Sequence, residues 1–373
     1  LLDELLDPRS LYSVPERKQQ STLLSHTIAS VDSNDLERQM ILLREFRQIA
    51  SLHVAAADVT GALPLMSVGA QLSELAEIEL HQAFQLAWDL LVEKHGRPPC
   101  TDTDDLNKCG FSVLAYGKLG GLELGYGSDL DLVFIYDDSR NQGSTNGNRP
   151  LDALVFYIRL AQRMISFLNT ITSSGILYEV DMRLRPNGES GLLVTSVSGF
   201  SDYQHDDAWT WEHQALVRAR CVTGDLNLAQ QVGEIRQEVL AKQRDRDIIT
   251  KEVSDMRAKM RGLLDKSSGQ LFDLKQGVGG ITDIEFMVQY AVLVWSADFP
   301  ELLLYTDNIR ILSTLMTTDK LNEQDGTLLA DAYRFYRKQA NLCVLQEMPA
   351  IVSLSEVEQY QPRIAALWQQ WFA

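Results

Sequence analysis

The run Gly127-Ser128-Asp129-Leu130-Asp131 places two aspartates one residue apart, directly after a glycine and a serine. In a strand, side chains two residues apart point to the same face, so Asp129 and Asp131 are expected to emerge together while Leu130 enters the core. Two adjacent carboxylates repel each other, and a divalent cation that prefers oxygen ligands, such as Mg²⁺, removes that penalty. The run therefore predicts a metal site.

Residues next to the aspartates are suited to bind a polyphosphate. The absence of a Cβ at Gly127 lets backbone N–H groups approach phosphate oxygens, and the hydroxyl of Ser128 adds another donor. Lys118 belongs to a glycine-dense run at 117–121 and is expected to assist. This segment therefore predicts a phosphate-binding site.

A second motif, Tyr178–Pro186, follows about fifty residues later and supplies a third carboxylate, Asp181. Arg183 and Arg185 follow at intervals of two residues, so in a strand their side chains would point to the same face as that of Asp181. Asp181 would complete a two-metal site, and the arginines would bind phosphate oxygens in bidentate fashion. Taken singly these features are also typical of turn caps and surface ion pairs, but together they favour catalysis.

The elements that must position these motifs can be read from hydrophobic periodicity. Helical patterns fill residues 35–95, with a break at 61–64, and a polar, proline-containing stretch at 95–105 ends them. Strands are expected at 111–115, 130–136 and 176–183, with an amphipathic helix at 151–169 between the last two. After residue 227 the pattern is helical, with no strand. We predict an α+β chain, mostly helical, with a small central mixed sheet.

The domain boundaries follow from these changes of pattern. We expect an N-terminal helical region at 1–95, a middle region with both motifs at 96–225, and a C-terminal helical bundle at 226–373. The chain does not begin with methionine, and we expect it to be part of a longer polypeptide.

Composition limits the class of substrate and the compartment. The net charge of −17 disfavours a nucleic-acid partner, because such proteins need a basic surface to release counterions. Four cysteines form no C-x-x-C pair, which favours reduced thiols in the cytoplasm. No apolar run is long enough to cross a membrane and the opening Leu1-Leu2-Asp3-Glu4 is no leader, so a soluble protein is expected.

Several other residues could have either a functional or a purely structural role. Arg218 and Arg220 would reach phosphates or form the solvated edge of an ordinary helix, and we favour the latter. His213 is expected on the surface or hydrogen-bonded, and residues 205–207 in a loop. The last two tryptophans, Trp368 and Trp371, are expected to pack in the core or between domains.

The segment at 275–285 also invites a second site, with Lys275, Asp283 and Glu285 around a glycine-rich turn. Thr282 and Glu285, however, have the spacing of a capping box that opens a helix. We favour the cap.

The central motifs resemble those of the polymerase-beta superfamily of nucleotidyltransferases. The chain more closely resembles the glutamine synthetase adenylyltransferase family, along nearly its whole length, through Y-G-K-L-G-G at 116–121, E-L-G-Y at 123–126, D-M-R-L-R-P at 181–186 and G-G-I-T-D-I-E-F at 279–286. Members of that family have two similar halves, one attaching AMP to a tyrosine of glutamine synthetase and one removing it by phosphorolysis.

This resemblance implies an ATP substrate, two Mg²⁺ ions held by Asp129, Asp131 and Asp181, and a nucleotidyltransferase domain at 96–225. It also implies glutamine synthetase as protein substrate, regulation by glutamine and a PII signal protein, and a companion adenylyl-removing half. The sequence of residues 125–131 resembles that of the attaching half. The open alternatives are the removing reaction, a small-molecule or nucleic-acid nucleotidyltransferase, and an inert helical docking module.

Overall fold

The computed structural model describes residues 14–372; residues 1–13 and 373, including Leu1-Leu2-Asp3-Glu4, lie outside the described part. The described part of the chain forms two compact units. Unit 1 comprises residues 14–203 and 220–233, and unit 2 comprises 204–219 and 234–372. The three-region division at residues 95 and 225 stays a prediction.

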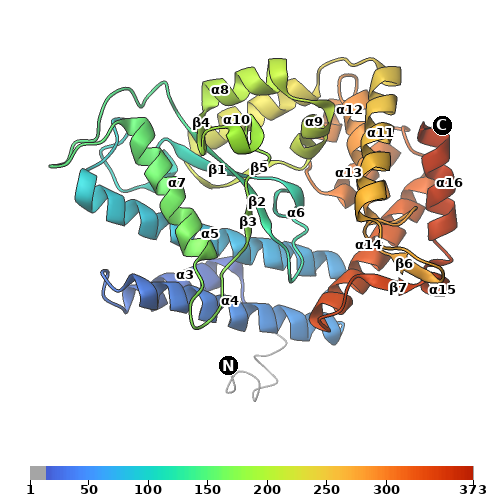
Figure 1. Cartoon of the computed structure of the whole chain (residues 1–373), viewed down its shortest axis with the longest axis horizontal. Helices are drawn as coiled ribbons and strands as arrows, with labels where there is room; N and C mark the ends of the chain where they lie inside the picture. The colour runs from blue at the N-terminus through green and yellow to red at the C-terminus, as the bar shows by residue number, and fades with distance from the viewer. Residues whose placement is uncertain (1–13, 373) are drawn as a thin grey trace. The chain divides into compact units, whose positions relative to one another are not determined.

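Three helices precede the sheet in unit 1: α3 (Arg17–Ala29), α4 (Leu36–Val59) and α5 (Leu65–His95). Both α3 and α4 lie alongside α5 (Figure 1). The helix break predicted at 61–64 is confirmed, because α4 ends at Val59 and Pro64 caps α5. The apolar stripe of α5, including Ala83, Ala87 and Leu91, is buried as its spacing predicts.

A small mixed sheet is the centre of unit 1. Its order is β3-β2-β1-β5, and β4 also pairs with β2. β1 (Phe111–Ala115) and β2 (Leu130–Tyr136) are antiparallel and coincide with two predicted strands. Both are buried because their apolar residues share one core with α5 and α7 (Ala153–Asn169), which contact each other; α7 is close to the helix predicted at 151–169. The stacked rings of Phe111, Phe134 and Tyr157 belong to this core.

Three short strands complete the sheet, β3 (Val180–Asp181), β4 (Val194–Ser196) and β5 (Arg220–Gly224). The strand predicted at 176–183 was too long, since only two of its residues pair with β2. The short helix η1 (Leu106–Lys108) precedes β1. The short helices α6 (Gly117–Gly120), η2 (Gly188–Ser190) and α8 (Val197–Asp202) lie between strands, and α10 (Leu226–Leu240) follows the sheet.

Unit 2 is built mainly from α9 (Thr210–Val217), α11 (Arg246–Leu264), α12 (Ile281–Trp295), α13 (Asn308–Thr317), α14 (Glu323–Leu345), α15 (Leu354–Val357) and α16 (Gln361–Phe372). Two predictions fail here. Two short strands far apart in the sequence, β6 (Leu271–Asp273) and β7 (Ile351–Ser353), form an antiparallel pair among the helices. Residues 205–207 belong to a π-helical turn, η3 (Tyr203–Asp207), rather than a loop; η4 is Pro300–Leu303.

The α+β prediction is confirmed. No helix in residues 14–372 is long and apolar enough to span a bilayer. All four cysteines are free thiols. Trp368 stacks on Phe372 at 4.2 Å, and Trp371 packs against Tyr290 and Trp295, so both tryptophans pack as predicted.

Candidate active site

The three predicted carboxylates lie at one edge of the sheet in unit 1. Asp129 immediately precedes β2, and Asp131 is its second residue. β3 runs parallel to β2 with Asp131 paired to Asp181, and Leu130 donates its N–H to the carbonyl of Glu179 at 2.9 Å. Leu130 is fully buried, as the alternation predicts. The backbone register thus brings all three aspartates to adjacent positions.

A cavity of about 620 Å³ opens at this edge. Its lining includes Asp129 and Asp181 together with Arg183 and Arg185; Glu179, Val180, Met182 and Glu189 complete it. Sequence reasoning missed the two glutamates. Glu179 shares its strand parity with Asp181, which was an available signal. Glu189 reaches the cavity through a turn that leaves no periodic pattern.

Asp181 is held by its neighbour Arg183. The Arg183 backbone N–H donates to Asp181 Oδ1 at 2.8 Å, and its guanidinium Nε lies 2.8 Å from Oδ2. These hydrogen bonds lower the pKa of Asp181. The Arg183 side chain is 74% exposed, so this is a surface ion pair that costs little to open.

The donor chemistry fits Mg²⁺, which takes carboxylate oxygens as ligands. Within residues 14–372, however, no group of three His, Cys, Asp or Glu side chains is close enough to hold a metal. The backbone register brings Asp131 and Asp181 side by side, and the Asp181 carboxylate is paired with the Arg183 guanidinium.

The absence of a side chain at Gly117 leaves the space that the Asp131 carboxylate occupies. This glycine has φ +57°, and a Cβ added there would lie 2.2 Å from Asp131 Oδ2. The carboxylate therefore sits directly against the turn that begins α6, and Tyr116 donates its N–H to the Asp131 carbonyl at 2.9 Å. The glycine-dense run thus positions a carboxylate, a role that its sequence did not predict.

Lys118 and Ser128 meet beside this turn. Lys118 Nζ lies 3.3 Å from Ser128 Oγ, which also accepts the N–H of Gly125 at 3.0 Å. Both contacts use the hydroxyl oxygen as acceptor, so its O–H proton can still be donated. Ser128 is buried and Gly127 is exposed. The predicted phosphate-binding site therefore has a lysine, a hydroxyl group and an exposed backbone segment close together.

Similarity to known proteins identifies the family of this chain. Residues 1–235 match the family model of glutamate-ammonia ligase adenylyltransferase. The chain belongs to the glutamate-ammonia ligase adenylyltransferase family. Residues 250–368 match a second family model, GlnD PII-uridylyltransferase.

Relatives that cover 99% of the chain carry the name bifunctional glutamine synthetase adenylyltransferase/adenylyl-removing enzyme. Those from Nitrosococcus oceani, Thioalkalivibrio sulfidiphilus and Pseudomonas syringae pv. tomato are 52%, 48% and 46% identical to it. The chain spans only 38%, 38% and 39% of these relatives' lengths.

In this member of the adenylyltransferase family, Arg185 has a different environment from Arg183. Its guanidinium donates to the carbonyls of Met182 at 2.8 Å and Glu189 at 3.0 Å, and more weakly to that of Gly191. Arg185 therefore holds together the loop that follows Asp181, and most of its donors are already used.

A buried hydrogen-bonded pair, Tyr178 and Glu79, anchors the segment that precedes β3. The Tyr178 hydroxyl donates to Glu79 Oε2 at 2.7 Å, and the Arg47 guanidinium stacks 3.8 Å from the Tyr178 ring centre. Burial raises the pKa of Glu79 to about 8, partly offset by Arg47 and Tyr178. Helix α5 is thus joined to the segment three residues before Asp181.

Arg218 and Arg220 do not form the solvated edge of a helix in this adenylyltransferase-family chain, because each is paired with a glutamate. Arg218 is buried and its Nη1 lies 2.6 Å from Glu285 Oε1. Arg220 lies in β5, where it pairs with Glu77 and donates to the carbonyl of Gly120. His213 is hydrogen-bonded to the carbonyl of Gln204, as predicted.

The predicted capping box at Thr282 is wrong. Helix α12 begins at Ile281 with Gly280 as its N-cap, and Glu285 pairs with Arg218 instead of reaching back. Asp283 fills the position at the helix start by accepting the N–H of Gly279 at 2.7 Å. It also pairs with Arg257 and Arg261 and is fully buried, while Lys275 is exposed.

Proposed function

We propose that this chain holds the active site of a magnesium-dependent enzyme that transfers AMP from ATP to a tyrosine hydroxyl of glutamine synthetase, releasing pyrophosphate. The observation that carries the proposal is the pairing of Asp131 with Asp181 on parallel strands, beside a cavity that Asp129 and Asp181 line. The name of the relatives supplies the substrate and the transferred group.

Asp129, Asp131 and Asp181 are the residues that would hold two Mg²⁺ ions. Bound Mg²⁺ would lower the pKa of the attacking phenol, ordinarily about 10, and offset the charge of the leaving pyrophosphate. Asp181 would exchange its partner Arg183 for this role, and its carboxylate would also accept the phenolic proton. The released Arg183 guanidinium then turns to phosphate oxygens at the mouth of the cavity.

The triphosphate is expected to lie along the segment from Lys118 to Ser128. Lys118 contributes positive charge, Ser128 a hydroxyl donor, and Gly127 an exposed backbone that phosphate oxygens can approach. Arg185 contributes mainly by fixing the loop that carries Glu189, because its donors are directed to backbone carbonyls.

The removing reaction on the same scaffold is the second candidate, because the relatives' name includes an adenylyl-removing activity. The wording of residues 125–131, with Tyr126 and Gly127 in place of the Phe and Ser of an N-F-S-S-D-I-D motif, favours the attaching reaction. The remaining length of the relatives offers space for a companion half with the removing activity.

Regulation and location are proposed on the same basis. The match of residues 250–368 to a PII-uridylyltransferase model supports control by a PII protein, with glutamine as the small effector. The four free thiols suit a reducing compartment, and we propose a cytoplasmic enzyme.

The test incubates the 373-residue chain with purified glutamine synthetase in two arms. One arm contains labelled ATP and unmodified glutamine synthetase, with or without Mg²⁺; the other contains phosphate and adenylylated glutamine synthetase. We expect Mg²⁺-dependent incorporation of AMP in the first arm. Release of ADP in the second arm alone would assign the removing reaction, and no turnover in either would refute the proposal.

A further inference from the structure

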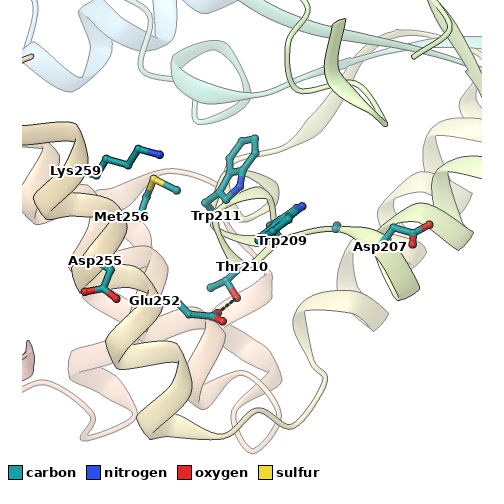
Figure 2. Close-up of a pocket in the computed structure, with 9 residues that line it drawn as sticks. Asp207, Trp209, Thr210, Trp211, Glu252, Asp255, Met256 and Lys259 are labelled. Atoms are coloured by element: carbon teal, nitrogen blue, oxygen red, sulfur yellow. Dashed lines mark hydrogen bonds between the residues drawn. The ribbon is translucent and has the colours of Figure 1, made fainter. Parts of the chain in front are cut away.

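A hollow of about 470 Å³ lies within unit 2. It is formed by the segment Asp207–Trp211, which leads into α9, and by one face of α11 (Figure 2). None of the roles proposed for AMP transfer uses its side chains.

Two tryptophans give the hollow its aromatic character. The Trp209 side chain is 70% exposed and Trp211 is 38% exposed, and Met256 from α11 lies across from them (Figure 2). Trp209 is held in this position by its backbone, whose N–H donates to Glu212 Oε2 at 3.0 Å. Large aromatic side chains left in water beside a hollow are typical of recognition surfaces, where Trp is enriched among residues that dominate binding.

Acidic side chains surround these rings. Asp207, Glu252 and Asp255 line the hollow, against one cation, Lys259, so the formal charge of the lining is −3 + 1 = −2. Glu252 is oriented by a hydrogen bond from the Thr210 hydroxyl (Figure 2). Glu252 and Asp255 are three residues apart on a helix and therefore share a face.

This combination selects for a cation and against a nucleotide. A polyphosphate would be repelled by the three carboxylates, although the indole rings alone would suit an adenine base. A cation over the face of an indole gains an electrostatic attraction, and Trp is the strongest of the aromatic residues in this respect. A guanidinium is planar, so it stacks on an indole and forms paired hydrogen bonds with a carboxylate, which an ammonium cannot do equally well.

We propose that this hollow binds an arginine side chain presented on the surface of a partner protein. Trp209 and Trp211 stack with the guanidinium, and Glu252 and Asp255 accept its N–H groups. The chain's net charge of −17 adds a long-range attraction for a partner with a basic surface. The inference stands independently of the proposed AMP transfer.

The test is a calorimetric titration of the 373-residue chain with Nα-acetyl-L-arginine methylamide. Matched titrations use the lysine and norleucine amides and Mg²⁺·ATP. We expect the arginine amide to bind at least about fivefold more tightly than the norleucine amide, and more tightly than the lysine amide, with affinity that falls as salt is added. Equal binding of either comparison amide, or displacement of the arginine amide by Mg²⁺·ATP, would overturn the proposal.

Variants separate the hollow from a general charge effect. Trp209→Leu and the double variant Glu252→Gln/Asp255→Asn should each weaken arginine amide binding at least about fivefold, whereas Trp209→Phe should retain most of it. The control Glu301→Gln/Glu358→Gln removes the same charge from exposed positions of unit 2 outside the hollow. An equal loss in the control, with circular dichroism unchanged in all variants, would contradict binding at this site.

Discussion

The hydroxyl of Tyr178 donates a 2.7 Å hydrogen bond to Glu79 Oε2, which joins the buried face of α5 to the segment that leads into β3. Glu79 is fully buried, and its other carboxylate oxygen, Oε1, has no hydrogen-bond partner. A carboxyl group in this setting favours its protonated form. The support behind Asp181 is therefore sensitive to pH.

Stability should depend on Glu79 between pH 5 and 8. The pKa of Glu79 is raised from 4.5 to about 8 in the folded chain, so its stabilising contribution is complete below pH 4.5 and is lost as the pH rises toward 8. Glu79→Gln removes this dependence. The free energy of unfolding of Glu79→Gln minus that of wild type should rise with pH, by up to about 1.4 kcal/mol per pH unit. Urea unfolding at several pH values measures it.

The control for this measurement is Glu93→Gln, which changes an exposed glutamate of the same helix. Its stability curve should run parallel to that of wild type across the pH range. A Glu79→Gln curve that is equally parallel would mean that Glu79 is ionised in the folded chain.

Gly117→Ala should abolish most activity. A Cβ at this position would lie 2.2 Å from Asp131 Oδ2, so the carboxylate must move, and φ +57° is strained for alanine. We expect AMP transfer to fall at least about tenfold and stability to fall by about 1 to 3 kcal/mol. Gly233→Ala in α10, where a Cβ meets nothing within 4 Å, should leave activity unchanged. Steady-state kinetics with denaturant unfolding distinguishes the two variants, and wild-type turnover in Gly117→Ala would exclude the positioning role.

Arg183 and Arg185 should differ in how they affect the enzyme. Arg183→Gln removes an exposed ion pair, so stability should change by less than about 1 kcal/mol while kcat/KM for ATP falls at least about tenfold. Arg185→Gln should destabilise the chain by about 1 to 2 kcal/mol, because it removes charge-assisted hydrogen bonds to the part-buried carbonyl of Met182 and to the carbonyl of Glu189. If Arg183→Gln kept full activity, Arg183 would have no part in binding phosphate.

Asp283→Asn tests the buried cluster in unit 2. Asp283 and Arg257 are both fully buried, so removing the negative charge leaves an uncompensated guanidinium and should cost about 3 to 5 kcal/mol. Asp331→Asn, which breaks the exposed pair with Arg334, should cost less than about 1 kcal/mol. Thermal unfolding compares them, and similar losses would show that Asp283 is not structurally required.

The parts of the fold that local patterns specify could be predicted from the sequence. β1, β2 and α7 come from compact apolar runs and a regular apolar stripe, and the positions of Asp129 and Asp131 follow from them. The third strand was predicted too long because only Val180 and Asp181 pair with β2, while Tyr178 turns its hydroxyl to Glu79, 99 residues away.

Long-range charge pairing accounts for most of the remaining differences. Arg218 pairs with Glu285 across 67 residues and Arg220 with Glu77 across 143, and no spacing rule contains such contacts. Thr282 and Glu285 had the spacing of a cap, but the buried partner of Glu285 decided its orientation. The pairing of Asp181 with Arg183 is local, but it was not predicted either, because both residues were assigned to the site and not to each other.

The most direct test of the central claim is AMP incorporation from labelled ATP into glutamine synthetase by Asp129→Asn, Asp131→Asn and Asp181→Asn, with Mg²⁺ varied and circular dichroism recorded for each. We predict that every variant keeps the wild-type spectrum and loses at least about 100-fold of the transfer rate, because each lacks one charged ligand of the metal. Near wild-type incorporation by any one of them would contradict a shared metal centre built from these three aspartates.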